Sequence, residues 1–291
     1  DHPFQFVTRP DEYTLCGPGV ADAKGGLLVM LTALEALERF AAPRDVGWQI
    51  VLNPDEEIGS PASVALLQNT ACDADLGLVY EPALPDGTLI RQRKGSGNFT
   101  VVVRGRSAHA GREIEKGRNA VAALTRLFVD IEQLHNPDHG VSLNLGRVVG
   151  GGPSNVVPDL AVGYFNARVL DHSSVAIIEG QLAELVEHAN EADGVAVELH
   201  GRFSSPPKLF DAASRQFFER VQSVGRSIGL SLPTAVSGGV CDGNKLAAVG
   251  LPTIDTLGPR GGHLHSARDF LLIASLVERA RLRAAVLVDF A

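Results

Sequence analysis

Apolar residues recur along the chain at two spacings, and each spacing predicts one kind of element. Between residues 25 and 40 leucines return at positions 28, 31, 34 and 37. This spacing places them on one face of a helix, and Pro43 ends that helix. Two shorter apolar runs, at residues 47–52 and 76–80, contain β-branched residues and are typical of buried strands. Helices and strands are therefore predicted to alternate in this part of the chain.

The pattern changes near residue 93, where a second domain is predicted to be inserted. Strands are expected at 99–103, 142–149, 160–169 and 195–199, and helices at about 119–134 and 174–192. Their order along the chain, β-α-β-β-α-β, is the split βαβ pattern of a small, ferredoxin-like α+β sandwich. We place this inserted domain at residues 94–208.

After Pro206-Pro207 the earlier pattern of helices and strands resumes. A helix is expected at 214–229, a strand at 252–255 and a final helix from Ile273. Strands that alternate with helices form a mostly parallel sheet, whose ligand sites gather beyond the carboxyl ends of the strands. Residues 1–93 and 209–291 are therefore predicted to form one α/β domain around the insertion.

Composition narrows the classes of protein to which the chain can belong. Its 291 residues suffice for two domains, and no apolar run is long enough to cross a bilayer. A net charge of -8 argues against binding to nucleic acid, because phosphate contacts need clustered Lys and Arg. Cys16, Cys72 and Cys241 are odd in number and far apart, which fits reduced thiols in a cytoplasmic protein. Because the chain opens at Asp1 without Met, a periplasmic or secreted location stays open.

Four acidic residues and one histidine have the chemistry of a metal site. They are Asp22, Glu56, Glu57, Glu81 and His265. Carboxylates with an imidazole suit a pair of divalent cations such as zinc that share a bridging ligand. Glu56 and Glu57 follow the predicted strand 47–52, and Gly59 can close their segment in a tight turn. An Asp-Glu-Glu run alone is more often a solvated loop, so its place at a strand end is what favours a site.

Two residues near the end of the chain have alternative interpretations. His263 competes with His265 as the histidine ligand, and His265 could also be an ordinary surface histidine. Asp242, in a glycine-rich segment, either orients a neighbouring metal ligand or caps a helix. Residue types alone leave both alternatives open.

Five separated segments occur in the order and spacing of one known family. They are Gly-Pro-Gly-Val-Ala-Asp-Ala-Lys-Gly-Gly at 17–26, Asn-Pro-Asp-Glu-Glu-Ile-Gly-Ser at 53–60, Tyr-Glu-Pro at 80–82, Ser-Ala-His-Ala-Gly at 107–111 and His-Ser at 265–266. On these segments the chain resembles the co-catalytic zinc peptidases that include glutamate carboxypeptidase, aminoacylase, acetylornithine deacetylase and succinyl-diaminopimelate desuccinylase. Glutamate carboxypeptidase is the most similar of these in the first two segments. The resemblance implies a hydrolase that cleaves an amide bond beside a free carboxylate, with an α/β catalytic domain and an inserted dimerisation domain.

The resemblance also implies a role for each candidate residue of the metal site. Asp22 bridges two divalent ions, Glu57 and His265 complete one metal site, and Glu81 belongs to the other. Glu56 is then the general base that takes a proton from the attacking water. Zinc is the expected metal, with cobalt or manganese as alternatives.

In the inserted domain the resemblance implies dimerisation and substrate binding. Similar proteins pair two subunits through this domain, and a histidine at the position of His109 reaches the other subunit's active site to stabilise the oxyanion. Asn155 and Arg168 match positions that hold the substrate carboxylate or the oxyanion, and Arg202 is a second candidate for that task. The family usually has an acidic residue two positions before the arginine, whereas this chain has Asn166. The implied partners are a small or peptide substrate with a free carboxylate and a second copy of the chain.

One expected feature of this family is missing from the chain. The first metal-binding histidine lies in a Gly-His-x-Asp-Thr segment upstream of the bridging aspartate, and no such segment occurs here. We therefore expect the chain to begin after that histidine, and its second metal site, with Asp22 and Glu81, to be incomplete. Such a fragment would be inactive or hold one ion, whereas the parent protein would be an active hydrolase. Two rival functions remain: an N-acyl-amino-acid deacylase, or a metal-free dimeric binding protein of the same fold.

Overall fold

The structure is a computed structural model that describes residues 6–40, 46–192 and 194–290, and it divides into two compact units. Asp1–Arg93 and Lys208–Ala291 form the first unit, and Lys94–Pro207 forms the second. The inserted domain is predicted from the sequence at 94–208. Each unit has its own hydrophobic core and is therefore described by itself.

The first unit combines parallel strand pairs with helices. Its helices are α1 (Gly26–Phe40), α2 (Val64–Cys72), α5 (Ala212–Ser227), α6 (Asp242–Ala247) and α7 (Ile273–Phe290), with helical turns at Val20–Gly25 and Glu56–Ile58. β2 (Gly77–Leu78) pairs parallel with β9 (Thr253–Ile254), and β3 (Leu89–Arg93) pairs parallel with β8 (Thr234–Ser237). β1 (Thr14–Cys16), β11 (Phe270–Leu272) and β10 (Gly261–Gly262) form a small antiparallel sheet. The predicted α/β fold with parallel strands is confirmed.

The core of the first unit packs α5 and α7 against the parallel strands. The Asp211 carboxylate caps α5 by accepting a hydrogen bond from the Ser214 backbone N–H at 2.8 Å. Phe217, Val221 and Val224 follow at helical spacing and are buried on one side of that helix. They belong to the same apolar cluster as residues of β9 and α7, so this core supports the strands that lead towards the acidic residues.

The predicted strand at 47–52 is wrong. Residues 46–52 belong to no strand, and none of the strands in the described part of the chain pairs with them. Trp48, Ile50 and Leu52 are 42%, 51% and 67% exposed, so the apolar side chains of this run lie at the surface. A strand needs a hydrogen-bonded neighbour, and an apolar pattern does not reveal whether one is present. The strand predicted at 76–80 is shorter than expected, because β2 covers Gly77–Leu78.

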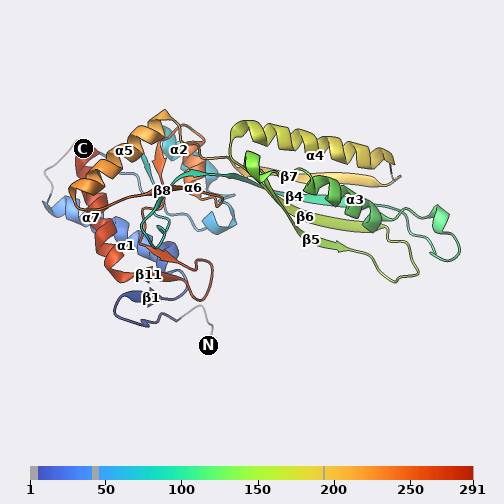
Figure 1. The fold of residues 1–291 in the computed structure, drawn as a ribbon, viewed down its shortest axis with the longest axis horizontal. Helices are drawn as coiled ribbons and strands as arrows, with labels where there is room; N and C mark the ends of the chain where they lie inside the picture. Colours follow the sequence, from blue (N-terminus) through green and yellow to red (C-terminus); the bar gives the residue numbers. More distant parts are fainter. Residues whose placement is uncertain (1–5, 41–45, 193, 291) are drawn as a thin grey trace. The chain divides into compact units, whose positions relative to one another are not determined.

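The second unit is a four-stranded antiparallel sheet with two helices packed on it. Its elements, in chain order, are β4 (Gly95–Arg104), α3 (Ala120–Glu132), β5 (Ser142–Gly150), β6 (Leu160–Val169), α4 (His172–Ala192) and β7 (Ala196–Ser205), with helical turns at Ile114–Lys116 and Pro137–His139. The strand order is β5-β6-β4-β7, and each neighbouring pair is antiparallel (Figure 1). This order confirms the predicted split βαβ pattern.

Alternation along β4 separates the two faces of this sheet. Phe99 is buried with residues of α3 and α4, and its ring stacks on Phe165 of β6 with 5.1 Å between the centroids. Asn98, the preceding residue, points to the opposite face. It lies in register with Asn166 of β6 and Arg202 of β7, so that face carries polar side chains.

A buried ion cluster lies where the chain leaves the first unit and where it returns. Asp255 accepts hydrogen bonds from Nε and Nη2 of Arg93, at 2.9 Å each, and from Nζ of Lys208 at 2.6 Å. Backbone hydrogen bonds also join Arg93 to Lys208, at 3.1 and 3.0 Å. Burial by itself raises the pKa of the Asp255 carboxyl, but the charges of Lys208 and Arg93 outweigh burial and hold that pKa below its ordinary value. The Asp255 carboxylate therefore binds both the residue at which the chain leaves the first unit, Arg93, and the residue at which it returns, Lys208.

Replacing Asp255 with Asn is expected to destabilise the protein by about 3–5 kcal/mol, because two buried cations would lose their counter-charge. In the unchanged protein the folded-state pKa of Asp255 is lowered, so its stabilisation is present above the unfolded-state pKa. That stabilisation is lost as the pH falls through the lower, folded-state value. Urea denaturation of both proteins at neutral and acidic pH measures the two effects.

Asp289→Asn is the matched control for this prediction. Asp289 also pairs with an arginine, Arg220, at 2.6 Å, but the two side chains are 42% and 48% exposed. Solvent screens a pair of this kind, so the control should lose less than about 1 kcal/mol of stability. Equal losses in the two variants would contradict the role assigned to burial of the Asp255 cluster.

Candidate metal centre

Asp22 lies at the entry to α1, on a segment that packs closely on the end of β2. Gly26 begins α1 so near to Tyr80 that an added Cβ would lie 2.3 Å from the Tyr80 carbonyl oxygen, an approach that only glycine permits. Burial raises the pKa of the Asp269 carboxyl. The backbone N–H groups of residues 19–22, on the same segment as Asp22, act in the opposite direction and lower that pKa. Close packing therefore brings Asp22 next to the strand end that is followed by Glu81.

Glu56 and Glu57 lie on a tight loop whose shape is held by Asp55. The Asp55 carboxylate accepts hydrogen bonds from the hydroxyl and the backbone N–H of Ser63, the second at 3.1 Å. Gly59 ends the helical turn with a φ of 91°, in the left-handed region that favours glycine. The loop presents two consecutive glutamates, of which Glu56 is half-buried and Glu57 is exposed.

The two candidate histidines both lie on the turn between β10 and β11, but their surroundings differ. Both have a positive φ, 54° for His263 and 58° for His265, which is uncommon outside glycine and often marks a functional turn. The Ser266 hydroxyl donates a hydrogen bond to the His263 carbonyl oxygen at 2.6 Å. The His263 ring lies against Phe270, with 5.7 Å between the centroids. His265 is the histidine that this turn directs towards the carboxylates.

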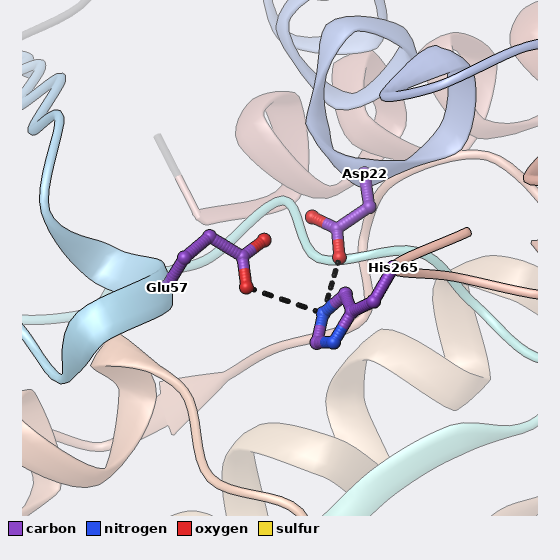
Figure 2. A group of neighbouring side chains, drawn as sticks. All are labelled: Asp22, Glu57 and His265. Atoms are coloured by element: carbon purple, nitrogen blue, oxygen red, sulfur yellow. Dashed lines mark ion pairs between the residues drawn. The ribbon is translucent and has the colours of Figure 1, made fainter. Parts of the chain in front are cut away.

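Asp22, Glu57 and His265 converge from three distant parts of the chain. Figure 2 shows that the two carboxylates point at the imidazole, whose Nε2 lies 3.4 Å from Asp22 Oδ2 and 3.2 Å from Glu57 Oε2. One ligand atom of each residue lies within 4.8 Å of the others, a spacing compatible with a shared cation. The Asp22 side chain is 10% exposed, whereas those of Glu57 and His265 are 58% and 68% exposed. The group is therefore backed by protein at Asp22 and open to solvent at the other two residues.

Glu56 and Glu81 experience the field of neighbouring like charges. Burial, followed by the charges of Asp242 and Glu57, raises the pKa of Glu56 to about 7. Burial, followed by the charges of Glu56 and Asp22, raises the pKa of Glu81 to about 8. The pKa of Asp22 is also raised, by burial first and by Glu57 second. A cation fits such a site, because its positive charge offsets both the burial and the mutual repulsion of the carboxylates.

The four candidates in the second unit lie in two places. His109 and Asn155 are exposed on adjoining loop segments, since the residue after His109 donates its backbone N–H to the Asn155 carbonyl oxygen at 2.9 Å. Arg168 and Arg202 lie on the polar face of the sheet, where Arg168 is half-buried and Arg202 exposed. The Nε of Arg168 donates to Oδ1 of Asn166 at 3.0 Å. Asn166 thus supplies a neutral acceptor at the position where an acidic residue was expected.

Two buried carboxylates beside the centre were given no role of their own from the sequence. Asp269 is 1% exposed and lies against the segment that carries Asp22, and Asp55 is 9% exposed and holds the loop of Glu56. The available signal was their position within a few residues of His265 and Glu56. That signal is weak, because Asp is equally common in ordinary turns.

Comparison with known sequences identifies the family. A sequence profile of peptidase family M20/M25/M40 matches residues 1–289. Carboxypeptidase G2 of Pseudomonas sp. (strain RS-16) is 30% identical over 283 residues, which cover 94% of this chain and 66% of that protein. Succinyl-diaminopimelate desuccinylase of Pseudomonas syringae pv. syringae is 27% identical over 288 residues, which cover 93% of this chain and 73% of that protein. The predicted relationship to these peptidases and deacylases is confirmed.

Solved structures agree on the fold. The aminopeptidase PepT of Bacillus cereus matches with a TM-score of 0.83 and covers 97% of this chain and 76% of that chain, at 21% sequence identity. At this identity the likeness concerns the fold alone. Since the profile match spans nearly all of the sequence and the acidic residues of its motifs meet in space, the chain belongs to peptidase family M20/M25/M40.

Proposed function

We propose that this protein is a metal-dependent hydrolase that cleaves an amide bond next to a free carboxylate, as glutamate carboxypeptidases do. The observation that carries the proposal is the convergence of Asp22, Glu57 and His265, with Glu56 on the same loop as Glu57. Membership of a peptidase family supports hydrolysis as the reaction class. The relative named a carboxypeptidase supports a substrate that ends in a free carboxylate.

Asp22, Glu57 and His265 would hold one divalent cation, and Asp22 with Glu81 would contribute to a second. Carboxylate oxygens with an imidazole suit zinc, and cobalt or manganese are alternatives. When bound, the cations would polarise the substrate carbonyl and make water a better nucleophile near neutral pH. Asp22 and Glu81 alone leave the second site short of ligands, because divalent transition metals take four or more.

Glu56 is proposed as the general base. It adjoins the ligand Glu57 in sequence but lies outside the group of three ligand atoms, so its carboxylate can act on a proton instead of holding a cation. It would take a proton from the attacking water as the new bond to the amide carbon forms. The same carboxyl would then donate that proton to the leaving amine nitrogen, and one residue would perform both transfers.

Residues of the second unit are proposed to recognise the substrate. Arg168 suits a planar carboxylate because its guanidinium can donate two parallel hydrogen bonds, and Asn166 holds its Nε. Arg202 shares the polar sheet face and is the second candidate for this task. Asn155 and His109 are proposed to stabilise the oxyanion, His109 in the active site of a second copy of the chain.

Deacylation of N-acyl amino acids is the second candidate function. A succinyl-diaminopimelate desuccinylase is among the relatives, and it would use the same metal chemistry with a different acyl pocket. A metal-free binding protein is a weaker candidate. Such a protein would be expected to lose its acidic ligands, whereas Asp22, Glu56, Glu57, Glu81 and His265 are all present.

We further propose that two copies pair through the second unit. Its sheet ends in β5 and β7, and outer strands have backbone groups available for pairing with another chain.

Among the described residues, no helix is long and apolar enough to cross a membrane. Cys16, Cys72 and Cys241 form no disulfide in the described chain, which supports the cytoplasm as the proposed location.

Glu56→Gln tests the proposed base. It should lower kcat by about 10²–10⁴-fold, because the amide cannot accept a proton, while the metal content stays unchanged. Turnover of a peptide ending in glutamate, measured on the full-length protein with added zinc or cobalt, gives kcat, and elemental analysis gives the metal content. Glu219→Gln, on the exposed side of α5, is the control and should keep full activity. Normal turnover by the Glu56 variant would overturn the assignment.

The two neighbouring histidines provide a test of the metal ligands. His265→Ala removes an imidazole that lies within 3.4 Å of two carboxylates, so it should lower metal affinity at least about 10-fold. His263→Ala removes only a ring contact with Phe270 and should keep normal affinity. Titration of the metal-free protein with cobalt measures both constants. If the His263 variant alone lost affinity, the ligand assignment would be wrong.

Arg168→Ala tests recognition of the carboxylate. Loss of a charged hydrogen-bond donor should raise KM by about 10–100-fold for a peptide ending in glutamate. The same peptide with an amidated C-terminus should be a poor substrate of the unchanged protein, because it offers Arg168 no carboxylate. A panel that adds N-acyl amino acids separates carboxypeptidase from deacylase activity. An unchanged KM in the Arg168 variant, with Arg202→Ala raising it, would transfer the role to Arg202.

A further inference from the structure

One buried carboxylate near the metal centre is neither a ligand nor the proposed base. Asp242 is 6% exposed and is the first residue of α6. Its Oδ1 accepts hydrogen bonds from the Ser60 hydroxyl at 2.5 Å and from Lys245 Nζ at 3.0 Å, and its Oδ2 accepts one from Asn53 Nδ2 at 2.8 Å. Two of these three donors lie almost two hundred positions earlier in the sequence, 182 and 189 residues away. Asp242 therefore joins α6 to the acidic loop.

The contacts of Asp242 reach both ends of that loop. Asn53 precedes Glu56 and Glu57, and Ser60 follows them. The Ser60 backbone N–H also donates to the Asp55 carbonyl oxygen at 2.7 Å, which closes the loop on itself. A single carboxylate that binds the two ends of a closed loop fixes where the loop lies against the rest of the unit.

Helix capping does not explain Asp242. The capping position of α6 is Cys241, whose backbone N–H donates to Asn244 Oδ1 at 3.1 Å. The charge of Asp242 is balanced by Lys245, whose side chain is 2% exposed. The carboxylate is thus held on its own helix and presents an acceptor to each of the two loop donors.

We infer that Asp242 is a positioning residue for the metal centre, which holds the loop so that Glu57 points at His265 and Glu56 stands beside them. This inference rests on the proposed function of the centre. Asp242 would act through its hydrogen bonds to Ser60 and Asn53, and it lies outside the group of three candidate ligand residues. Mutation of groups that orient metal ligands typically lowers metal affinity or activity by about 10–100-fold.

Asp242→Asn is the direct test. An amide has one acceptor oxygen and no charge, so the variant side chain could not accept hydrogen bonds from Asn53 Nδ2 and from the Ser60 and Lys245 donors at once, and its hold on the loop would weaken. Cobalt titration of the metal-free full-length protein should show an affinity about 10–100-fold lower. With saturating cobalt, kcat for a peptide ending in glutamate should fall while KM stays the same, because the substrate-binding residues are untouched.

Ser60→Ala provides a second route to the same result. It removes one of the two loop donors and leaves the carboxylate, Asn53 and Lys245 in place, so it serves even where Asp242→Asn fails to fold. Its cobalt affinity should fall in the same direction. If both residues act through one hydrogen bond, the double variant should be little worse than the more affected single variant. Full additivity would contradict that coupling.

Val221→Ala separates positioning from general stability. Val221 is fully buried in α5, away from the acidic loop, so the variant should unfold a few degrees lower and keep its cobalt affinity. An Asp242→Asn protein that behaves like Val221→Ala, less stable but normal in cobalt affinity and kcat, would overturn the inference. That outcome would not contradict the proposed hydrolase activity. Normal turnover by Glu56→Gln would instead contradict the assignment of Glu56 as the base, and it would leave the measured cobalt affinities unaffected.

Discussion

Crowding of carboxylates around one imidazole is the constraint on which the rest of the first unit depends. Asp22, Glu56 and Glu81 have raised pKa values because they are partly removed from water and close to one another. Such an arrangement opposes folding unless the segments that carry the acids are held by other contacts. The acidic side chains come from a glycine-packed helix entry, a closed loop and a strand end. A cation would be stabilised there because the protein has already brought the negative charges together.

Two buried ion clusters supply much of that support. Asp255 joins the chain at Arg93 and Lys208, and Asp242 joins α6 to the loop of Glu56. A buried ion pair adds little net stability compared with well-packed apolar residues, because desolvation offsets most of the attraction. Its effect is mainly on specificity: a buried carboxylate without its own partners costs several kcal/mol, so alternative arrangements of the segments are disfavoured. Both clusters therefore select which distant segments meet.

The second unit follows a different principle. Its helices cover one face of an antiparallel sheet, and the opposite face carries Asn98, Asn166 and Arg202 in one row. An antiparallel sheet tolerates this asymmetry, since one of its faces can pack on a core while the other stays solvated and polar. Arg168 lies on that polar face, two residues along β6 from Asn166, which accepts a hydrogen bond from its Nε. A rigid polar face of this kind can recognise a carboxylate without rearranging the core behind it.

The sequence by itself determined the β-α-β-β-α-β order of the second unit and the residues whose chemistry suits a cation, because periodicity and side-chain chemistry are local properties. It could not distinguish a surface run from a paired strand at 47–52, since the apolar pattern is the same for both. Residue types alone left His263 and His265 as alternatives, the family resemblance favoured His265, and the tertiary structure brings His265 to Asp22 and Glu57. Only the tertiary structure decided the contacts of Asp242, whose loop partners lie far away in the chain. Contacts between distant segments depend on how the whole unit packs, and no local pattern encodes that packing.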